Sequence, residues 1–325
     1  MNTKAPYLVS SEKPDVKEGI WPILNVAPNT IESIAPKRAQ ELFEAISKDG
    51  DLTVLLKDSR DSLPIAFRDT RTVGVTHSLA ECLWCAGFTY LTYRIELDRQ
   101  NPEPGGPISL KLGGADSLDI AEADYTLKRA LFTAVRLELL GWRSLPTPVM
   151  PKDVTDDSSL EERAGDLLLE ALGFILHQQL AHIHLGHTAV PGDTPFTLEQ
   201  EKEADALAIE SILKEAPDDA TAEKRCFAIA MSLVYFTTLR IERYLDTGPL
   251  APIDPSYPLP YDRMDAAIQL EMVRSNPFLK ETLTRLASAA LVPSVKLRKQ
   301  RLEDTYDDYA SLYKACIDAL TATVK

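Results

Sequence analysis

Apolar residues recur at helical spacing along most of this chain, and the pattern predicts a mainly helical protein. Helices are expected over residues 36–48, 77–97, 123–141, 160–188, 198–214, 222–245, 262–274, 277–290 and 300–323. The apolar runs at 52–57 (LTVLLK) and 63–68 (LPIAFR) are short enough to be strands. The predicted fold class is therefore mainly α with a small β element, an α+β arrangement.

Prolines mark the expected boundaries between these elements. Proline-rich stretches at 101–107, 145–151 and 247–260 are predicted loops, because proline lacks a backbone donor and restricts the residue before it. We expect three parts, which are a mixed N-terminal segment with short strands over 1–75, a helical core over 76–290 and a C-terminal helix over 291–325.

Composition and charge indicate the class of protein and the partners it is not expected to bind. The 325 residues are 45% hydrophobic and 26% charged, which is ordinary for a soluble globular protein. The net charge of −14 opposes binding to nucleic acid or to an anionic membrane, because both are negatively charged. No apolar run reaches the length of a bilayer span. We therefore expect neither nucleic acid nor a membrane as a partner.

The cysteines indicate a reducing compartment. Four cysteines in a chain of this length do not form a disulfide framework. Cys82 and Cys85 form a CxxC pattern inside the apolar stretch ECLWCAGFTYL, and two buried thiols one helical turn apart are the simplest interpretation. A metal or redox pair would need a polar, partly open setting. We therefore expect a cytoplasmic location.

The histidines are concentrated in one predicted helix. Four of the five, His177, His182, His184 and His187, lie within 11 residues. At about 100° per residue, His177 and His184 fall on a polar stripe and are expected at the surface. His187 follows a glycine at the helix end and is also expected to be exposed, near the helix dipole. His182 instead shares an apolar face with Gln178 and is expected to point inward.

The next helix places a carboxylate against His182. Its predicted start, Thr197 with Gln200, fits a capping box. One face of this helix carries Glu201, Ala204, Asp205 and Ala208. The small alanines allow a close helix contact, so Glu201 points into it and needs a cation or hydrogen-bond donors. His182 is either that donor or, together with Glu201, a ligand of one metal ion.

This pair of segments, QQLAH (178–182) and EKEAD (201–205), resembles the zincin-type metallopeptidases of the glutamate-ligand branch. Those peptidases carry HExxH on one helix and ExxAD or ExxAN on a following helix. The M48, IrrE/ImmA-like and Lit-like phage-exclusion (peptidase U49) families share this layout, and the Lit-like group resembles the chain most. A later segment resembles their His-Pro…Arg element, with Tyr257 replacing the histidine and Arg263 at the arginine. The resemblance covers roughly residues 160–275 and implies a zincin-like core with a zinc site.

The resemblance also implies roles for single residues, and the chain departs from several of them. His182 and Glu201 stand at metal-ligand positions, and Asp205 is a further candidate ligand. Gln178 stands where the first imidazole ligand would be, and Gln179 where the glutamate base would be. A neutral amide is no base and is a poor zinc ligand. We therefore expect zinc to be absent or weakly bound.

His177 lies one position before the ligand position that Gln178 occupies. On a regular helix its ring diverges from that of His182 by about 140°. Both rings would reach one metal ion only if the helix carried a π-bulge. We therefore do not expect His177 to be a ligand.

Three functions remain open from the sequence. The leading one is a metallopeptidase-like protein with a degenerate, inactive site that binds or regulates a protein or peptide, with phage defence implied by the resemblance. The second is an active zinc peptidase in which His182 and Glu201 act with His177 or Asp205. The third is a helical interaction protein without a site, in which His182 and Glu201 form a buried hydrogen-bonded pair.

Overall fold

A computed structural model describes residues 7–11, 20–57, 64–102, 107–110, 118–140, 160–187, 196–247, 262–303 and 305–322. Their elements in chain order are β1 (Tyr7–Ser11), α1 (Trp21–Ile34), α2 (Pro36–Ile46), η1 (Ser47–Asp49), β2 (Leu52–Lys57), β3 (Ile65–Phe67), β4 (Thr72–Thr76), α3 (His77–Gln100), β5 (Ile108–Ser109), α4 (Leu118–Leu140), α5 (Leu160–His184), α6 (Leu198–Lys214), α7 (Asp219–Thr247), α8 (Asp262–Gln269), α9 (Glu271–Arg274), α10 (Pro277–Leu297), β6 (Thr305–Tyr306) and α11 (Tyr309–Thr321). The predicted fold class, mainly α with a small β element, is confirmed.

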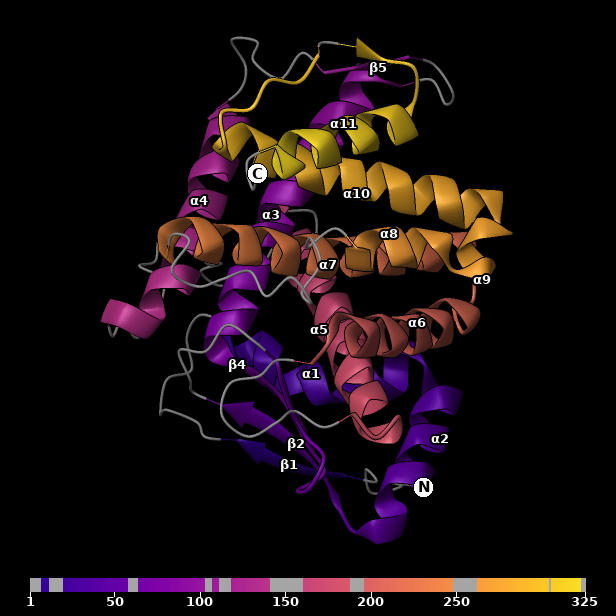
Figure 1. Ribbon diagram of the computed structural model, residues 1–325. Coiled ribbons are helices and arrows are strands. Elements are labelled where there is room, and N and C mark those ends of the chain that lie inside the picture. The colour runs from indigo at the N-terminus through magenta and orange to yellow at the C-terminus, as the bar shows by residue number, and fades with distance from the viewer. Residues whose placement is uncertain are drawn as a thin grey trace.

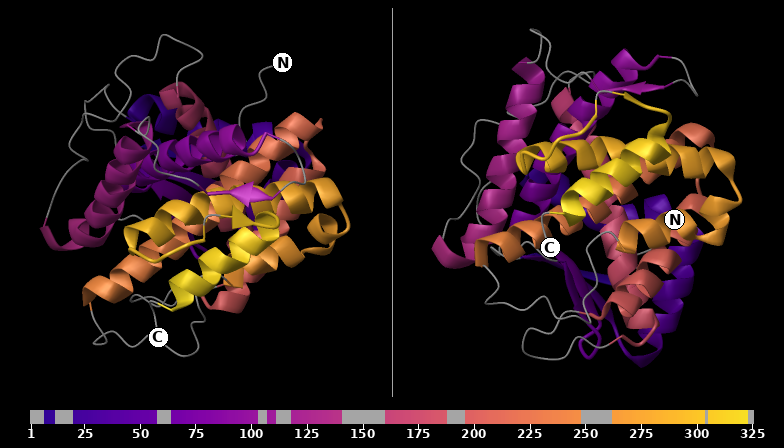
Figure 2. Two further views of the ribbon diagram at one scale, coloured as in Figure 1. Left: turned by 90° about the horizontal axis from the view of Figure 1, so that it is seen from above. Right: turned by 45° about the horizontal axis from the view of Figure 1, so that its top comes forward.

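A four-stranded sheet lies at one end of the molecule, with the order β1-β2-β4-β3 (Figure 1). The strands β1, β2 and β4 run parallel, and β3 pairs antiparallel with β4. Leu52, Val54 and Leu56 alternate with partly exposed residues along β2, so one face of this strand is buried. Helices α10 and α11 pack on each other at the end opposite the sheet (Figures 1 and 2). A second, two-stranded sheet pairs β5 with β6.

Helix α5 connects the sheet to the helical part. It contacts β3 and β4 as well as α1, α2, α3, α6 and α7. Its sequence is apolar on more than one face, as expected for a helix with neighbours all round. Gly173 allows α1 to approach closely, because a Cβ there would lie 2.0 Å from Ile34 Cδ1 and 3.2 Å from Thr30 Cβ. One hydrophobic core runs from Tyr7 in β1 to Leu320 in α11.

Several predicted boundaries are confirmed and others are wrong. Helix α6 occupies 198–214 and β2 occupies 52–57, both as predicted. Helix α1 was not predicted, and it contains Pro22 in its first turn and Pro28 inside it. The predicted helix 262–274 is interrupted near Leu270, which has an extended backbone between α8 and α9. The final helix begins at Tyr309 instead of residue 300. The division of the chain into three parts stays a prediction.

The cysteine prediction agrees with the structure. All four cysteines are free and buried. Burial raises the pKa of Cys82 to about 12 and that of Cys85 well above its usual value, so both remain thiols at neutral pH. Within the described ranges, no helix combines the length and apolar content needed to cross a bilayer. The predicted loops at 145–151 and over 248–260 lie outside the described residues.

Candidate functional site between α5 and α6

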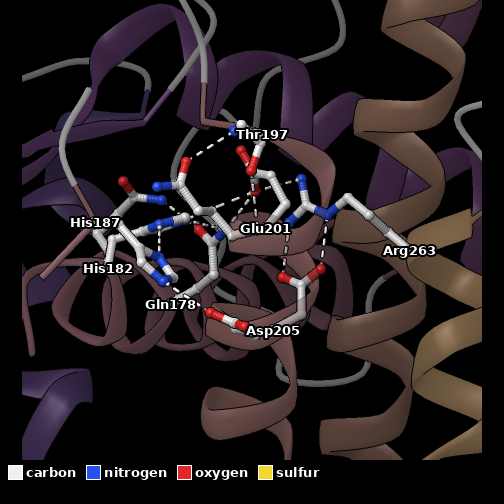
Figure 3. Close-up of polar contacts among 10 residues, drawn as sticks. Gln178, His182, His187, Thr197, Glu201, Asp205 and Arg263 are labelled. Carbon is white, nitrogen blue, oxygen red and sulfur yellow. Dashed lines mark hydrogen bonds and ion pairs between the residues drawn. The ribbon is translucent and has the colours of Figure 1, made fainter. Parts of the chain in front are cut away.

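A polar cluster lies where α6 packs on α5, and Arg263 of α8 reaches into it (Figure 3). Gln178 and His182 are one turn apart on α5, and both are buried as predicted. Glu201 on α6 faces this contact, as predicted, and Asp205, one turn later, binds Arg263 of α8. The capping box at Thr197 and Gln200 is present and fixes the start of α6 one turn before Glu201.

The Gln178 amide lies between the two predicted metal ligands. Its Nε2 donates to Glu201 Oε2 at 2.8 Å and lies 3.1 Å from His182 Nε2. Because an amide nitrogen only donates, the imidazole Nε2 accepts this second bond. The His182 and Glu201 atoms that share the amide are 3.7 Å apart. One N–H of the Gln178 carboxamide therefore donates to His182 and the other donates to Glu201.

The neighbouring Gln179 sets which way this amide faces. Its own Nε2 donates to the carbonyl Oε1 of Gln178, and both side chains are buried. That bond holds the Gln178 oxygen away from Glu201 and turns the nitrogen towards it. In the opposite orientation the oxygen would repel the Glu201 carboxylate. The two glutamines therefore act as a hydrogen-bonded pair.

The end of α5 returns His187 onto His182. Gly186 has a φ of +75°, which favours glycine, and the chain reverses there. His187 N donates to His182 O at 2.9 Å and Gly186 N to Ile183 O at 3.1 Å, the two bonds of a Schellman motif. The first and last residues of this motif touch, so the His187 ring meets the His182 ring edge-on. The prediction that His187 is exposed was wrong, since it is buried.

These contacts fix the proton positions on both rings. His182 Nε2 accepts from Gln178, so in the neutral ring Nδ1 carries the proton and donates to His187 Nδ1 at 3.0 Å. His187 then carries its proton on Nε2 and donates to Glu203 Oε2 at 3.0 Å. Burial lowers the pKa of His187, which favours this neutral state, although Glu203 acts in the opposite direction. A directed chain of hydrogen bonds thus runs from Gln178 to the exposed carboxylate of Glu203.

Arg263 holds the two carboxylates of α6 from the first turn of α8. Its Nε and Nη2 each donate to Asp205 at 2.7 Å, and its Nη1 lies 3.0 Å from Glu201 Oε2. A planar guanidinium binds a carboxylate through two parallel bonds in this way. Burial raises the pKa of Asp205, and the charge of Arg263 works against that rise. Arg263 therefore orients Glu201 towards the amide of Gln178.

Phe196 covers the His182 ring. The two rings are stacked with centroids 3.7 Å apart and an interplanar angle of 12°. Phe196 lies directly before the capping residue Thr197, so the start of α6 also positions this aromatic ring. His182 has no exposed surface as a result of these contacts.

The remaining histidines of α5 lie apart from this cluster. His177 was predicted at the surface, but it is fully buried, and its Nε2 donates to the carbonyl of Ile31 in α1 at 2.9 Å. The helical wheel failed at this position because α1 packs over His177. His184 is exposed, as predicted. Tyr257 lies outside the described residues.

The residues present do not fit a catalytic zinc ion. Zinc needs at least three protein donors at about 2.0–2.3 Å. His182 and Glu201 supply two, and Gln178 presents its amide nitrogen to them instead of a donor atom for a metal. Asp205 is engaged by Arg263, and His177 by Ile31. Across the described ranges, no group of three or more His, Cys, Asp or Glu side chains is arranged to hold a metal.

The sequence pattern missed His187, Glu203 and Phe196 as members of the cluster. The Leu-Gly-His ending of α5 was the available signal for His187, because glycine at that position indicates a Schellman motif. Once His187 is placed, Glu203 follows as an acceptor on α6. Phe196 had no comparable signal, since its position depends on how α6 docks.

Comparisons with known proteins agree with this layout. A family model described as Peptidase U49 matches residues 73–279, a range that includes α5, α6 and α8. The Cell death peptidase of Escherichia coli (strain K12) is 26% identical over 256 residues, which cover 77% of this chain and 81% of that protein. No solved structure matches the chain.

Proposed function

The chain belongs to the peptidase U49 family, and from this membership we propose that it is a peptidase-like protein that binds a protein or peptide without hydrolysing it. The observation that carries the proposal is the Gln178 amide, which takes up His182 Nε2 and Glu201 Oε2 together. Gln179 adds to it, because its neutral amide stands at the base position and donates to Gln178 instead of activating water.

The active-peptidase alternative has less support in the described contacts. It needs His177 or Asp205 as a third ligand. The His177 ring donates to the backbone of α1, and both Asp205 oxygens accept from Arg263. The alternative of a helical interaction protein without a site also fits the buried His182–Glu201 pair. It does not explain why the chain belongs to a peptidase family.

Zinc content and peptide cleavage test the proposal together. We expect purified protein, dialysed against zinc-buffered solution, to hold far less than one zinc ion per chain. We also expect a mixed peptide library to stay intact, with peptide binding unchanged by a chelator. Stoichiometric zinc that is lost in His182→Ala and in Glu201→Gln would sink the proposal, as would cleavage abolished by chelators.

The cellular setting is proposed from resemblance. The similarity to the phage-exclusion group and to a Cell death peptidase leads us to propose a role in phage defence in the cytoplasm. Four free, buried thiols suit a reducing compartment. Plating efficiency of phages on cells with and without the chain tests this role. We expect fewer plaques when the chain is present, and unchanged counts over a broad phage panel would contradict it.

A further inference from the structure

We propose that the amides of Gln178 and Gln179 together take the place of a metal ion, so that this cluster is a latent zinc site that substitution of Gln178 alone can open. The proposal rests on the zinc-free site of the proposed function and adds a specific claim about why that site is stable.

The Gln178 amide makes as many bonds to His182 and Glu201 as a metal ion would. A metal ion between His182 and Glu201 would accept one lone pair from each. The Gln178 nitrogen offers each of them one hydrogen atom, at 3.1 and 2.8 Å. A buried imidazole nitrogen would be costly without a partner, and the amide gives Glu201 a second donor beside Arg263. The carboxamide therefore meets the same need as the ion.

His182 is held in the orientation that a metal ion would need. The bonds from His182 to His187 and from His187 to Glu203 keep the proton on His182 Nδ1. The Nε2 lone pair is thereby directed at the space that Gln178 occupies. This is the neutral form of imidazole that a metal ion also requires. The stacked ring of Phe196 keeps the imidazole plane fixed.

Glu201 is likewise held in place by its neighbours. Arg263 binds it at 3.0 Å while held by two bonds to Asp205. The Glu201 and His182 atoms are 3.7 Å apart, within reach of one ion bonded at about 2 Å to each. Two ligands are thus positioned by neighbours that do not depend on the glutamines.

The two glutamines act as a pair. Gln179 donates to Gln178 Oε1, so the amide of Gln178 is held with its nitrogen towards both acceptors. Without that bond the buried Gln178 oxygen would lose its donor, and the amide would be held in this orientation by His182 and Glu201 alone. Both positions are therefore needed for the substitute for the ion.

The test converts Gln178 into a ligand in the full chain. Gln178→His adds an imidazole one turn before His182. Gln178→Glu is isosteric and supplies a carboxylate ligand if the imidazole does not fit, although without zinc it repels Glu201. Gln269→His, at the exposed end of α8, is the matched control for zinc binding to any added histidine. Zinc alone is the probe, measured as bound zinc per chain after dialysis and as the shift in melting temperature.

We expect Gln178→His to bind one zinc ion per chain, about 100-fold or more tightly than the parent chain or Gln269→His. Its melting temperature should rise with zinc, and adding His182→Ala should abolish both effects. Gln178→Glu should show the same zinc dependence more weakly. Gln179→Leu should lower the melting temperature without any gain of zinc.

Different results would overturn different claims. If the parent chain is zinc-free and both folded Gln178 variants bind no more zinc than Gln269→His, the latent site is wrong while the proposed function stands. If the parent chain is zinc-free but cleaves peptides, the proposed function is wrong while the latent site stands. Stoichiometric zinc in the parent chain that depends on His182 would overturn both.

Discussion

Burial governs the titration of the His177 imidazole. The ring is fully buried between α5 and α1, and its one bond is to the carbonyl of Ile31. Desolvation lowers its pKa from 6.5 to about 4, and the bond to Ile31 opposes that shift only in part. The folded protein therefore keeps this ring neutral over a pH range in which the unfolded chain protonates it.

The first prediction is a loss of stability in mild acid. Between pH 6.5 and about 4 the unfolded chain binds one more proton at His177 than the folded chain. The free energy of unfolding should therefore fall as pH falls through this window, by up to roughly 3 kcal/mol from this residue. His177→Gln keeps a donor for Ile31 and cannot titrate, so its loss over the same window should be smaller.

Urea unfolding at pH 7 and pH 4.5 measures this difference. His184→Gln is the control, because His184 is exposed two turns further along the same face of α5. Partial burial and the charge of Arg38 lower its pKa, but it lacks the full burial of His177, so its replacement should change the slope less than His177→Gln does. Equal pH dependence in His177→Gln and the parent chain would show that the buried ring does not control it.

The site could be predicted from the sequence only where side chains follow helix geometry. The inward positions of Gln178, His182 and Glu201 follow from periodicity within α5 and α6. The burial of His177 does not, because it depends on α1, a helix more than 140 positions earlier. The contact of His187 depends on a backbone reversal that a helical wheel does not represent.

At the scale of elements, the sheet requires a glycine in β4. Gly74 pairs with Leu55 of β2, and a Cβ there would lie 2.3 Å from the Leu55 carbonyl oxygen. We predict that Gly74→Ala lowers the free energy of unfolding by about 1–3 kcal/mol, because backbone must move to make room. Thermal or urea unfolding measures the effect.

Gly165 in α5 is the matched control for that substitution. Its nearest neighbour for an added Cβ is the end of the Ile23 side chain at 3.3 Å, which can shift. Alanine also favours a helix over glycine by about 1 kcal/mol. Gly165→Ala should therefore be neutral or stabilising, and a larger loss than in Gly74→Ala would contradict the argument about β4.

Helix α2 receives its N-terminal cap from another helix. Its own capping position, Ala35, has no side-chain acceptor. Glu215, at the end of α6, accepts from Lys37 N at 3.0 Å and from Arg38 N at 2.9 Å. A carboxylate there satisfies two unpaired donors and favours the positive end of the helix dipole.

We predict that Glu215→Ala lowers the free energy of unfolding by about 1 kcal/mol, as loss of a helix cap does. Glu210→Ala, one turn earlier on α6, removes only a surface pair with Lys214 and should change it by less than about 0.5 kcal/mol. Denaturant midpoints of the two variants give the comparison. Equal values would mean that Glu215 does not cap α2.

Most helices could be predicted from the sequence because their apolar spacing is strong over many residues. Strands β1 and β4 were missed since each has five residues and too little alternation to stand out. Helix α1 was missed because two prolines interrupt its pattern, although one lies in the first turn, where a missing donor costs little. Short or proline-containing elements are fixed by their neighbours instead.

At the scale of the whole molecule, one core joins the sheet to the C-terminal helices. It includes Trp21 in α1, Trp84 in α3 and Leu320 in α11. We predict a single cooperative unfolding transition, with the same midpoint by tryptophan fluorescence and by far-ultraviolet circular dichroism. Separate midpoints would show that the sheet end and the helical end unfold independently.

The packing of the elements was the part least accessible from the sequence. Contacts such as Glu215 with α2 join residues 177 and 178 positions apart. No local pattern specifies them, because many helix faces have similar apolar stripes.

The central place of α5 has a consequence for synthesis of the chain. All four strands of the main sheet have been made once Thr76 is added, but α5 begins only at Leu160. At about 5–20 residues per second, roughly 4–17 s separate the two events. During that interval α5 does not yet cover β3 and β4, so chaperones have time to bind the apolar surface that α5 later buries.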